Sequence, residues 1–240
     1  KQATKNNVEK VYKTHRDWLT IAGNSVPIYL VNGNHEQAAA YLLDGTQTNP
    51  AILAGSARLK YFPLPAPNYF YTGNSTQISG LGLPRDYYAW NWGDALFIVM
   101  DVYRYDCDTT AKPHNWDWTI GDKQYAWRKS TLENSTAKYK FAFAHHFRGE
   151  DRGGILNAKL YEWGGYDGDG KTYSFDKNRP GWGKPIHQVF KDSGVTIFFQ
   201  GHDHLFAKED LDGMVYQEVP MPSDSTYEIG MLANADAYTA

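Results

Sequence analysis

The chain has 240 residues, of which 42% are hydrophobic and 21% charged, and this suits one large domain or at most two small ones with enough apolar material for a core. A balance of 24 basic and 27 acidic residues gives a net charge of -3, which excludes electrostatic capture of nucleic acid as the main function. The apolar runs are far too short to cross a bilayer, and a single cysteine, Cys107, excludes an intrachain disulfide and a cysteine-based zinc cluster.

Helix and strand patterns alternate along the first part of the chain. Apolar residues spaced three and four apart predict an amphipathic helix capped by Asn6 or Asn7, and residues 23–24 are expected to end it in a left-handed conformation. The apolar run at residues 27–31 is typical of a buried strand. The loop that follows leads into a second predicted helix over residues 37–43.

A long connection separates these elements from the rest of the chain. Residues 44–86 are rich in Gly, Pro, Asn and Ser and are expected to be mostly irregular, with one helix near residues 51–60. Residues 87–100 are then predicted to form a hairpin that turns at Gly93 and Asp94.

The second half of the chain continues the alternation. Its predicted elements are a helix at 122–134, a strand at 138–144, an irregular insertion at 147–183, a helix at 185–191, a strand at 195–200 and an antiparallel pair at 205–208 and 214–219. This order indicates an α/β layered domain, and one domain is expected to span residues 1–240. In such sheets, ligands bind beyond the carboxyl ends of the strands.

Side chains that can bind metals follow three of the predicted strands. In chain order they are Asn34 and His35, then His145 and His146, then His202 and His204. Imidazole suits zinc, iron or manganese, and carboxamide oxygen suits the harder ions. Glycines at 33 and 201 allow tight turns and close approach to a ligand. Three strand ends that converge with such ligands predict a metal site.

These blocks resemble a known family. The motifs GNHE at 33–36, HH at 145–146 and GHDH at 201–204 resemble the last three motif blocks of the calcineurin-like metallophosphoesterases. YYAWNWGD at 87–94 and QYAW at 124–127 resemble the purple-acid-phosphatase-like branch. The resemblance spans most of residues 10–225, and the two glycine-led motifs in this order are more specific than either alone. It implies a layered β-sandwich flanked by helices.

The resemblance also implies roles for the residues in these blocks. Asn34, His145 and His202 would bind one metal ion, His204 would bind a second, and His35 would contact the phosphate and help the leaving group depart. The ions would be divalent or trivalent Zn, Mn or Fe. Two of them activate a bridging water for attack on phosphorus and neutralise charge on the phosphoryl oxygens. A small phosphoester is the implied substrate.

Two further residues are candidates for substrate binding. Arg148 follows the histidine pair, and a guanidinium fork matches phosphate oxygens, although a solvated loop arginine is an equal alternative. His146 is expected to face the substrate or the interior. Side chains alternate along an extended chain, so only one histidine of the pair can easily reach a shared metal.

The family's two earlier motif blocks, which supply the bridging carboxylate and most ligands of the second metal, do not occur before Gly33. We therefore expect the chain to be a piece of a longer phosphoesterase, truncated at its amino end and also at its carboxyl end. Two ions would bind in the parent and fewer or none here, because a cation pair with few anionic ligands repels itself. This piece is expected to be inactive or nearly so.

Alternatives remain open from the residues alone. One is a non-catalytic module that binds a ligand or a carbohydrate through aromatic-lined loops, since aromatic residues make up 15% of the chain and many lie in the two insertions. Another is a mononuclear zinc hydrolase that uses His145, His202 and His204. The branch resemblance favours a secreted or periplasmic protein, and the oligomeric state is open.

Three other patterns have simpler interpretations. His15 and His187 lie at helical spacing and are predicted to be hydrogen-bonded core histidines. Residues 166–170 begin like a calcium loop, but the later acidic ligands and the closing Glu of such a loop are missing. A surface turn is therefore predicted there.

Overall fold

The centre of the fold is a mixed sheet of seven strands in the order β1-β2-β3-β4-β5-β7-β6. The computed structural model describes residues 3–37, 43–103, 114–147 and 153–221. Its strands are β1 (Thr72–Gly73), β2 (Tyr88–Trp92), β3 (Ala95–Val99), β4 (Tyr139–Phe143), β5 (Ile197–Gln200), β6 (Ala207–Leu211) and β7 (Met214–Glu218). Strands β3, β4, β5 and β7 run parallel, so their carboxyl ends meet at one edge of the sheet.

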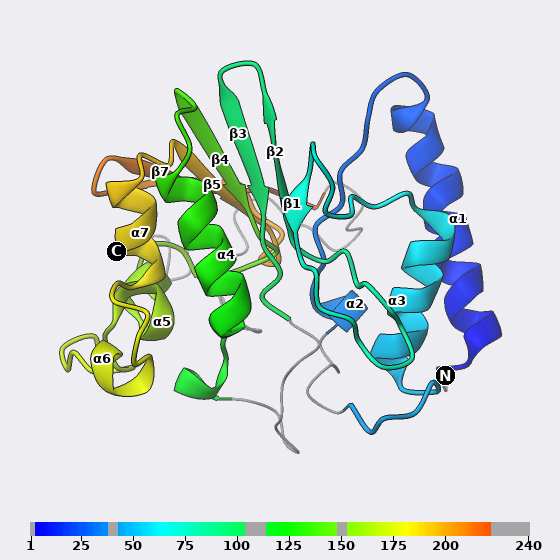
Figure 1. Ribbon diagram of the computed structural model, residues 1–240, viewed down its shortest axis with the longest axis horizontal. Helices are drawn as coiled ribbons and strands as arrows, with labels where there is room; N and C mark the ends of the chain where they lie inside the picture. The colour runs from blue at the N-terminus through cyan, green and yellow to red at the C-terminus, as the bar shows by residue number, and fades with distance from the viewer. Residues whose placement is uncertain (1–2, 38–42, 104–113, 148–152, 222–240) are drawn as a thin grey trace.

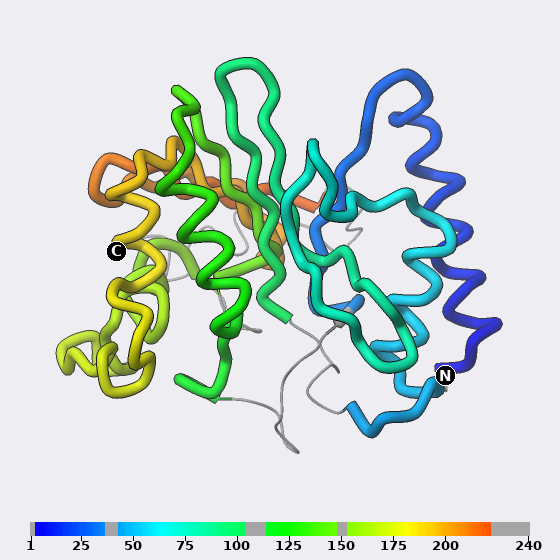
Figure 2. The backbone as a smooth tube through the Cα atoms, viewed as in Figure 1, coloured from blue at the N-terminus to red at the C-terminus, as the bar shows by residue number. Residues whose placement is uncertain are grey.

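Helices lie on one face of the sheet and beyond its β1 edge. They are α1 (Lys5–Gly23), α2 (Asn34–Gln37), α3 (Pro50–Tyr61), α4 (Gly121–Glu133), α5 (Tyr161–Gly164), α6 (Phe175–Asn178) and α7 (Ile186–Asp192), with 3₁₀ turns at Asn115–Asp117 and Asn157–Lys159. Figure 1 shows α4, α5 and α7 in front of the sheet, whereas α1 and α3 stand together beyond β1. Figure 2 traces the backbone through these two groups of helices. The α/β class predicted from the sequence is confirmed.

The face of the sheet under α4, α5 and α7 carries the main core; we call it the covered face. Side chains alternate along a strand, so every second residue points to this side. Ile98, Ala142, Phe198 and Tyr216 are all buried here and belong to one hydrophobic cluster with residues of the three helices. The ring of Trp163, from α5, packs on Phe198 at a centroid distance of 5.0 Å.

The opposite face, which we call the open face, carries a row of aromatic rings across four strands. The rings of Trp90 and Phe97 stack at 5.0 Å, and those of Phe143 and Phe199 stack at 5.1 Å. Phe97 also lies 6.4 Å from Phe143, which joins the two pairs into one row. Tyr29 covers one end by stacking on Trp90 at 4.0 Å. The rings of Phe97, Phe143 and Phe199 are only half-buried.

The segment at residues 27–31, predicted to be a strand, forms no strand in the structure. It is held by side chains instead, since Tyr29 stacks on Trp90 and the hydroxyl of Tyr88 donates a hydrogen bond of 2.8 Å to the carbonyl of Leu30. Both edges of β2 are already paired, with β1 and with β3. An apolar run at this place therefore has no free edge of β2 to join.

The ends of the first two helices also differ from prediction. The cap of α1 is Thr4, whose hydroxyl accepts the backbone N–H of Asn7 at 3.3 Å, and the helix starts before Asn6. Asn24 ends it in a right-handed conformation with φ -59°, so the predicted left-handed cap is wrong. Helix α2 begins at Asn34 itself, and residues 38–42 of the predicted second helix lie outside the described residues.

The remaining predicted elements are confirmed with small shifts at their ends. They comprise the helix α3, the β2–β3 hairpin, the helices α4 and α7, the parallel strands β4 and β5, and the β6–β7 hairpin. Within the described part of the chain, no helix combines the length and the apolar character needed to cross a membrane.

Candidate metal centre

Three side chains from different parts of the chain meet beyond the carboxyl ends of β4 and β5. The Nε2 atom of His145 lies 3.0 Å from Oδ1 of Asn34 and 3.1 Å from Nδ1 of His202. The two imidazole rings are nearly perpendicular, with centroids 5.0 Å apart. The structure thus brings together the three residues that the sequence proposed as ligands of one ion. We call Asn34, His145 and His202 the trio.

Backbone hydrogen bonds between neighbouring strands align the two histidines. β4 and β5 are parallel, and just past β4 the N–H of Ala144 donates to the carbonyl of Phe199 at 3.1 Å. One step further, the N–H of Gly201 donates to the carbonyl of His145 at 2.9 Å. The ladder therefore continues past the ends of the strands and sets His202 beside His145.

The loop that carries Asn34 lies close to His145, and this brings Asn34 to the histidines. The side chain of Glu36 accepts the N–H of Gly33 at 2.8 Å, and the N–H of Glu36 donates back to the carbonyl of Gly33 at 3.1 Å. A Cβ atom at Gly33 would lie 3.2 Å from the ring of His145, tighter than ordinary contact. A larger residue would therefore have to displace the ring of His145 slightly, and glycine permits the close approach. At Gly201 a Cβ would lie 3.9 Å from its nearest neighbour, so space does not require glycine there.

The turn after β5 has an uncommon backbone. His202 has φ 84° and His204 has φ 59°, a left-handed region that residues other than glycine rarely adopt. The buried Asp203 between them fastens the turn: its carboxylate accepts the N–H of Gly153 at 2.8 Å, and its own N–H donates to Glu218 at 3.2 Å. Strain of this kind persists where surrounding contacts fix it, and it is common at functional sites.

The other predicted site residues have different surroundings. His146 is fully buried, and its ring lies 5.2 Å from that of His202 and 5.5 Å from that of Phe147. It therefore faces the interior, which was one of its two predicted positions. His35 is exposed and His204 is half-buried. Arg148 lies outside the described residues.

Sequence reasoning missed Arg58, whose side chain binds the segment that leads into the trio. This buried arginine of α3 donates one hydrogen bond of 2.5 Å to the side chain of Asn32 and another of 3.1 Å to the carbonyl of Pro84. Asn32 lies two residues before Asn34, so Arg58 fixes the backbone that leads into the trio. One sequence signal was available, a single cation in the mostly apolar stretch at residues 51–59, but this signal does not identify the partner of Arg58.

The donor set of the trio is chemically suited to a metal ion. Two ligands of one ion with bonds of about 2.1 Å at right angles lie about 3.0 Å apart, close to the separations within the trio. Two imidazoles and a carboxamide oxygen suit zinc, manganese or iron. The trio holds no carboxylate, and among the described residues no three His, Cys, Asp and Glu side chains gather as a metal cluster would. Any ion bound here receives no anionic charge from the trio.

The two histidines predicted to lie in the core differ from one another. His187 is buried, with Nδ1 2.7 Å from the hydroxyl of Tyr216 and Nε2 3.2 Å from the carboxylate of Asp212. Burial lowers its pKa, an effect that Asp212 partly offsets. This prediction is confirmed. His15 is exposed on α1, so the same prediction is wrong there.

The segment that resembles a calcium loop is a hydrogen-bonded turn. The carboxylate of Asp167 accepts the indole N–H of Trp116 at 2.6 Å and the hydroxyl of Ser174. Asp169 accepts the backbone N–H groups of Lys171 and Thr172, at 2.8 and 2.9 Å. Because these carboxylates serve the turn, the interpretation as a surface turn is confirmed.

Comparisons with known proteins give only remote likenesses. No protein-family model matches the chain, and no curated protein matches it significantly. Among solved structures, a purple acid phosphatase from yellow lupin (Lupinus luteus) seeds is 16% identical, with a TM-score of 0.44, over 81% of this chain and 31% of the lupin chain. GAP50, described as the anchor in the inner membrane complex of Plasmodium, is 15% identical, with a TM-score of 0.33, over 62% of this chain and 41% of its own. The chain spans less than half the length of either protein, and likenesses this remote carry no argument about function.

Proposed function

We propose that this chain carries part of the active site of a metal-dependent phosphoester hydrolase. The observation that carries the proposal is the meeting of Asn34 and His202 at the Nε2 atom of His145. The three side chains come from three separate segments, and their atoms are spaced as neighbouring ligands of one ion are. The motif blocks that contain them support the choice of phosphoester chemistry.

Each residue of the site has a proposed task. The trio holds one Zn, Mn or Fe ion, and His204 contributes to a second ion. A metal ion supplies charge neutralisation at the phosphoryl oxygens and lowers the pKa of a bound water. His35 is exposed at the start of α2, next to Asn34, where it contacts the phosphate and assists the leaving group. Arg148 is the further phosphate contact that the sequence suggests.

The charges of the site limit what this chain does alone. Neutral ligands do not offset the repulsion between two cations, so we propose that the chain binds at most one ion tightly. Carboxylates from elsewhere in a longer protein would complete the dinuclear centre. Phosphoesterase activity is therefore proposed for that whole protein, and this chain alone is expected to hydrolyse slowly or not at all.

Metal titration tests the trio directly. Calorimetric titration with Zn²⁺ and with Mn²⁺ is expected to show binding that weakens more than tenfold in His145→Ala and in Asn34→Ala. His15→Ala is the matched control, since it removes an exposed histidine outside the trio and leaves binding unchanged. Equal affinity in all four proteins would contradict the proposal.

Two further measurements separate the alternatives. A mononuclear site made of His145, His202 and His204 predicts a large loss of affinity in His204→Ala and none in Asn34→Ala. Hydrolysis of p-nitrophenyl phosphate and of bis-p-nitrophenyl phosphate with added Mn²⁺ measures activity on a monoester and a diester. Robust turnover of either by this chain would refute the claim that the piece lacks a complete centre.

A further inference from the structure

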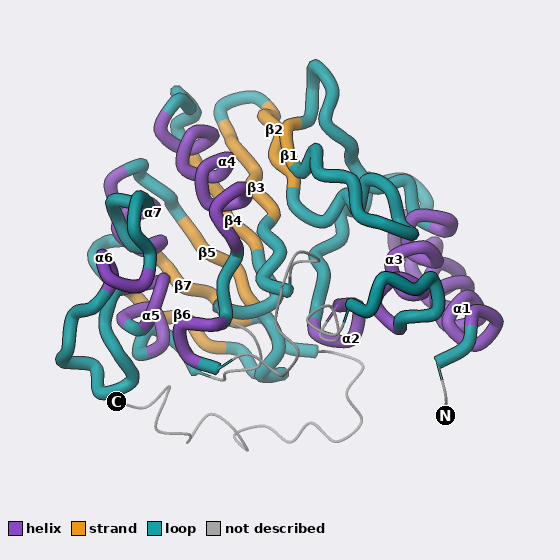
Figure 3. Tube along the Cα trace, turned by 60° about the horizontal axis from the view of Figure 1, so that its bottom comes forward, coloured by secondary structure: helices purple, strands orange, loops and turns teal. Residues whose placement is uncertain are grey.

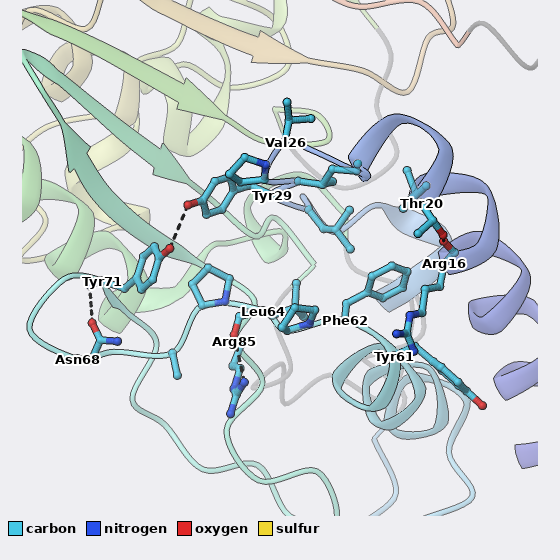
Figure 4. Close-up of a pocket in the computed structure, with 18 of the residues that line it drawn as sticks. Arg16, Thr20, Val26, Tyr29, Tyr61, Phe62, Leu64, Asn68, Tyr71 and Arg85 are labelled. Carbon is cyan, nitrogen blue, oxygen red and sulfur yellow. Dashed lines mark hydrogen bonds between the residues drawn. The ribbon is translucent and has the colours of Figure 1, made fainter.

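A second site-like feature lies away from the trio. A cavity of about 720 Å³ opens between the end of α1, the segment that follows it and the proline-rich loop after α3. Figure 4 shows side chains from these segments arranged around a common space. The volume falls within the range of roughly 300–1,000 Å³ that is typical of pockets for small organic molecules. None of the trio lines this cavity.

Apolar side chains make most of the wall. They include Leu19 of α1, Ile28 and Leu30 of the following segment, and Phe62 and Leu64 of the loop. The loop also contributes prolines at 63, 65 and 67, whose fixed φ angles stiffen the backbone. Such a wall is largely formed before a ligand arrives and favours an apolar body.

The polar lining of the cavity includes a pair of hydroxyl groups. The hydroxyl oxygens of Tyr29 and Tyr71 lie 3.0 Å apart. Burial, together with Tyr71, raises the pKa of Tyr29 to about 12, so Tyr29 is uncharged near neutral pH. The Tyr29 hydroxyl therefore adds polarity without negative charge.

The charge of the lining is positive. Arg16 and Arg85 line the cavity, and none of the lining residues that the structure describes is acidic. Arg85 is partly engaged, since it donates a hydrogen bond of 3.1 Å to the carbonyl of Leu64. Arg16 is exposed, and among the described residues no ion pair or hydrogen bond engages its guanidinium. Cationic side chains in the lining of an apolar cavity match a ligand with an anionic head and an apolar body.

We propose that this cavity binds an organic monoanion with an alkyl body, of the chemistry of a medium-chain carboxylate. The alkyl body lies among the apolar residues of the loop and of α1, and the carboxylate pairs with Arg16. A neutral ligand gains nothing from the arginines, and a cationic one is repelled by them. The site is independent of the proposed hydrolase centre, because the two share no residue, and either proposal can fail alone.

Calorimetric titration with dodecanoate, at concentrations below micelle formation, tests the proposal. Dodecanol and dodecyltrimethylammonium keep the alkyl body and change the head to neutral or cationic. We expect one dodecanoate per chain, bound at least tenfold more tightly than either analogue. Absence of saturable binding, or equal affinity for dodecanol, would overturn the proposal.

Substitutions locate the binding site and its charge requirement. Arg16→Ala is expected to weaken dodecanoate binding about tenfold and to leave dodecanol binding unchanged. Arg16→Glu is expected to reverse the preference toward dodecyltrimethylammonium. Lys13→Ala, which removes another exposed cation of α1 that does not line the cavity, is the matched control and leaves all affinities unchanged. An equal loss in Lys13→Ala would refute the role of Arg16.

One more variant excludes binding elsewhere on the surface, such as on the open face of the sheet. Ala66 lies in the loop, lines the cavity and is half-buried. In Ala66→Trp the indole fills the cavity, and dodecanoate binding is expected to disappear while the circular dichroism spectrum is retained. Unchanged binding in this variant would place the ligand outside the cavity and sink the proposal.

Discussion

Phe198 and Phe199 are neighbours on β5, yet they lie in different surroundings. Phe198 is fully buried on the covered face, against Trp163 and Phe190, whereas Phe199 is half-buried in the aromatic row of the open face. Both faces are rich in apolar side chains. The strand sequence therefore indicates that both sides are apolar, but the helices decide which side becomes core. Figure 3, turned from the view of Figure 1, shows α4 and α7 lying along the sheet.

The difference between the two faces predicts the largest change in the free energy of unfolding. Phe198→Ala leaves a cavity in a closed core and is expected to lower the free energy of unfolding by about 3–5 kcal/mol. Phe199→Ala removes a ring that is already partly in water and is expected to cost about 1–2 kcal/mol. Guanidinium denaturation followed by circular dichroism measures both. Equal losses would show that the open face is as well packed as the covered one.

The two tryptophans of β2 sharpen the comparison within the open face. Trp90 is buried between Tyr29 and Phe97, whereas Trp92 is 71% exposed. Trp90→Ala is expected to cost about 3 kcal/mol and to release the segment that Tyr29 anchors. Trp92→Ala is the matched control, and its free energy of unfolding is expected to stay within about 0.5 kcal/mol of that of the unsubstituted chain. Limited proteolysis near residues 24–30 measures the release, and an unchanged cleavage rate in Trp90→Ala would contradict the anchoring role.

Substitution of a buried cation on the covered face is expected to change the free energy of unfolding by a smaller amount. Arg128 of α4 is fully buried between the rings of Tyr125 and Phe190, and none of its guanidinium nitrogens has a hydrogen-bond partner among the described residues. Burial lowers its pKa to about 10, because the guanidinium is removed from water. Arg128→Met is expected to raise the free energy of unfolding by about 1 kcal/mol. A loss of stability in denaturant titration would show that the contacts with the two rings outweigh the cost of burial.

The smallest predicted effect is a pH dependence under the covered face. Burial lowers the pKa of His187, so as pH falls through the ordinary value of 6.5 the unfolded chain gains a proton before the folded one. This contribution to stability is complete above that value and is lost as pH falls toward the folded pKa. His187→Gln is expected to flatten the fall in unfolding free energy between about pH 7 and pH 5. His15→Gln, at an exposed position, serves as the control, and an equal slope in His187→Gln and the parent would refute the assignment.

Local patterns predicted the elements whose partners lie next to them. The β2–β3 hairpin was visible because its turn residues and alternating strands are adjacent in the sequence. Residues 27–31 were misjudged because an apolar run shows that a segment is buried without showing whether its backbone pairs. The same limit explains α1, whose apolar Val11 and Trp18 are exposed although their spacing predicts a buried face.

The site was predictable to the extent that its residues stand in motifs. Asn34, His145 and His202 each follow a glycine or a strand end, and the fold brings them within hydrogen-bond distance. Arg58 could not be assigned, because its bond to Asn32 joins residues 26 positions apart and no local pattern encodes such a contact. The left-handed backbone at His202 and His204 was equally hidden, since it depends on the buried contacts of Asp203.

The trio divides into a fixed part and an adjustable part. His145 and His202 inherit their spacing from adjacent parallel strands, so substitutions around them have little freedom to move one relative to the other. Asn34 instead belongs to a four-residue helix, and the segment leading into this helix is held by hydrogen bonds with the side chains of Glu36 and Arg58. Substitutions at Glu36 or Arg58 are therefore expected to shift Asn34 relative to the two imidazoles, whose own spacing is set by the sheet.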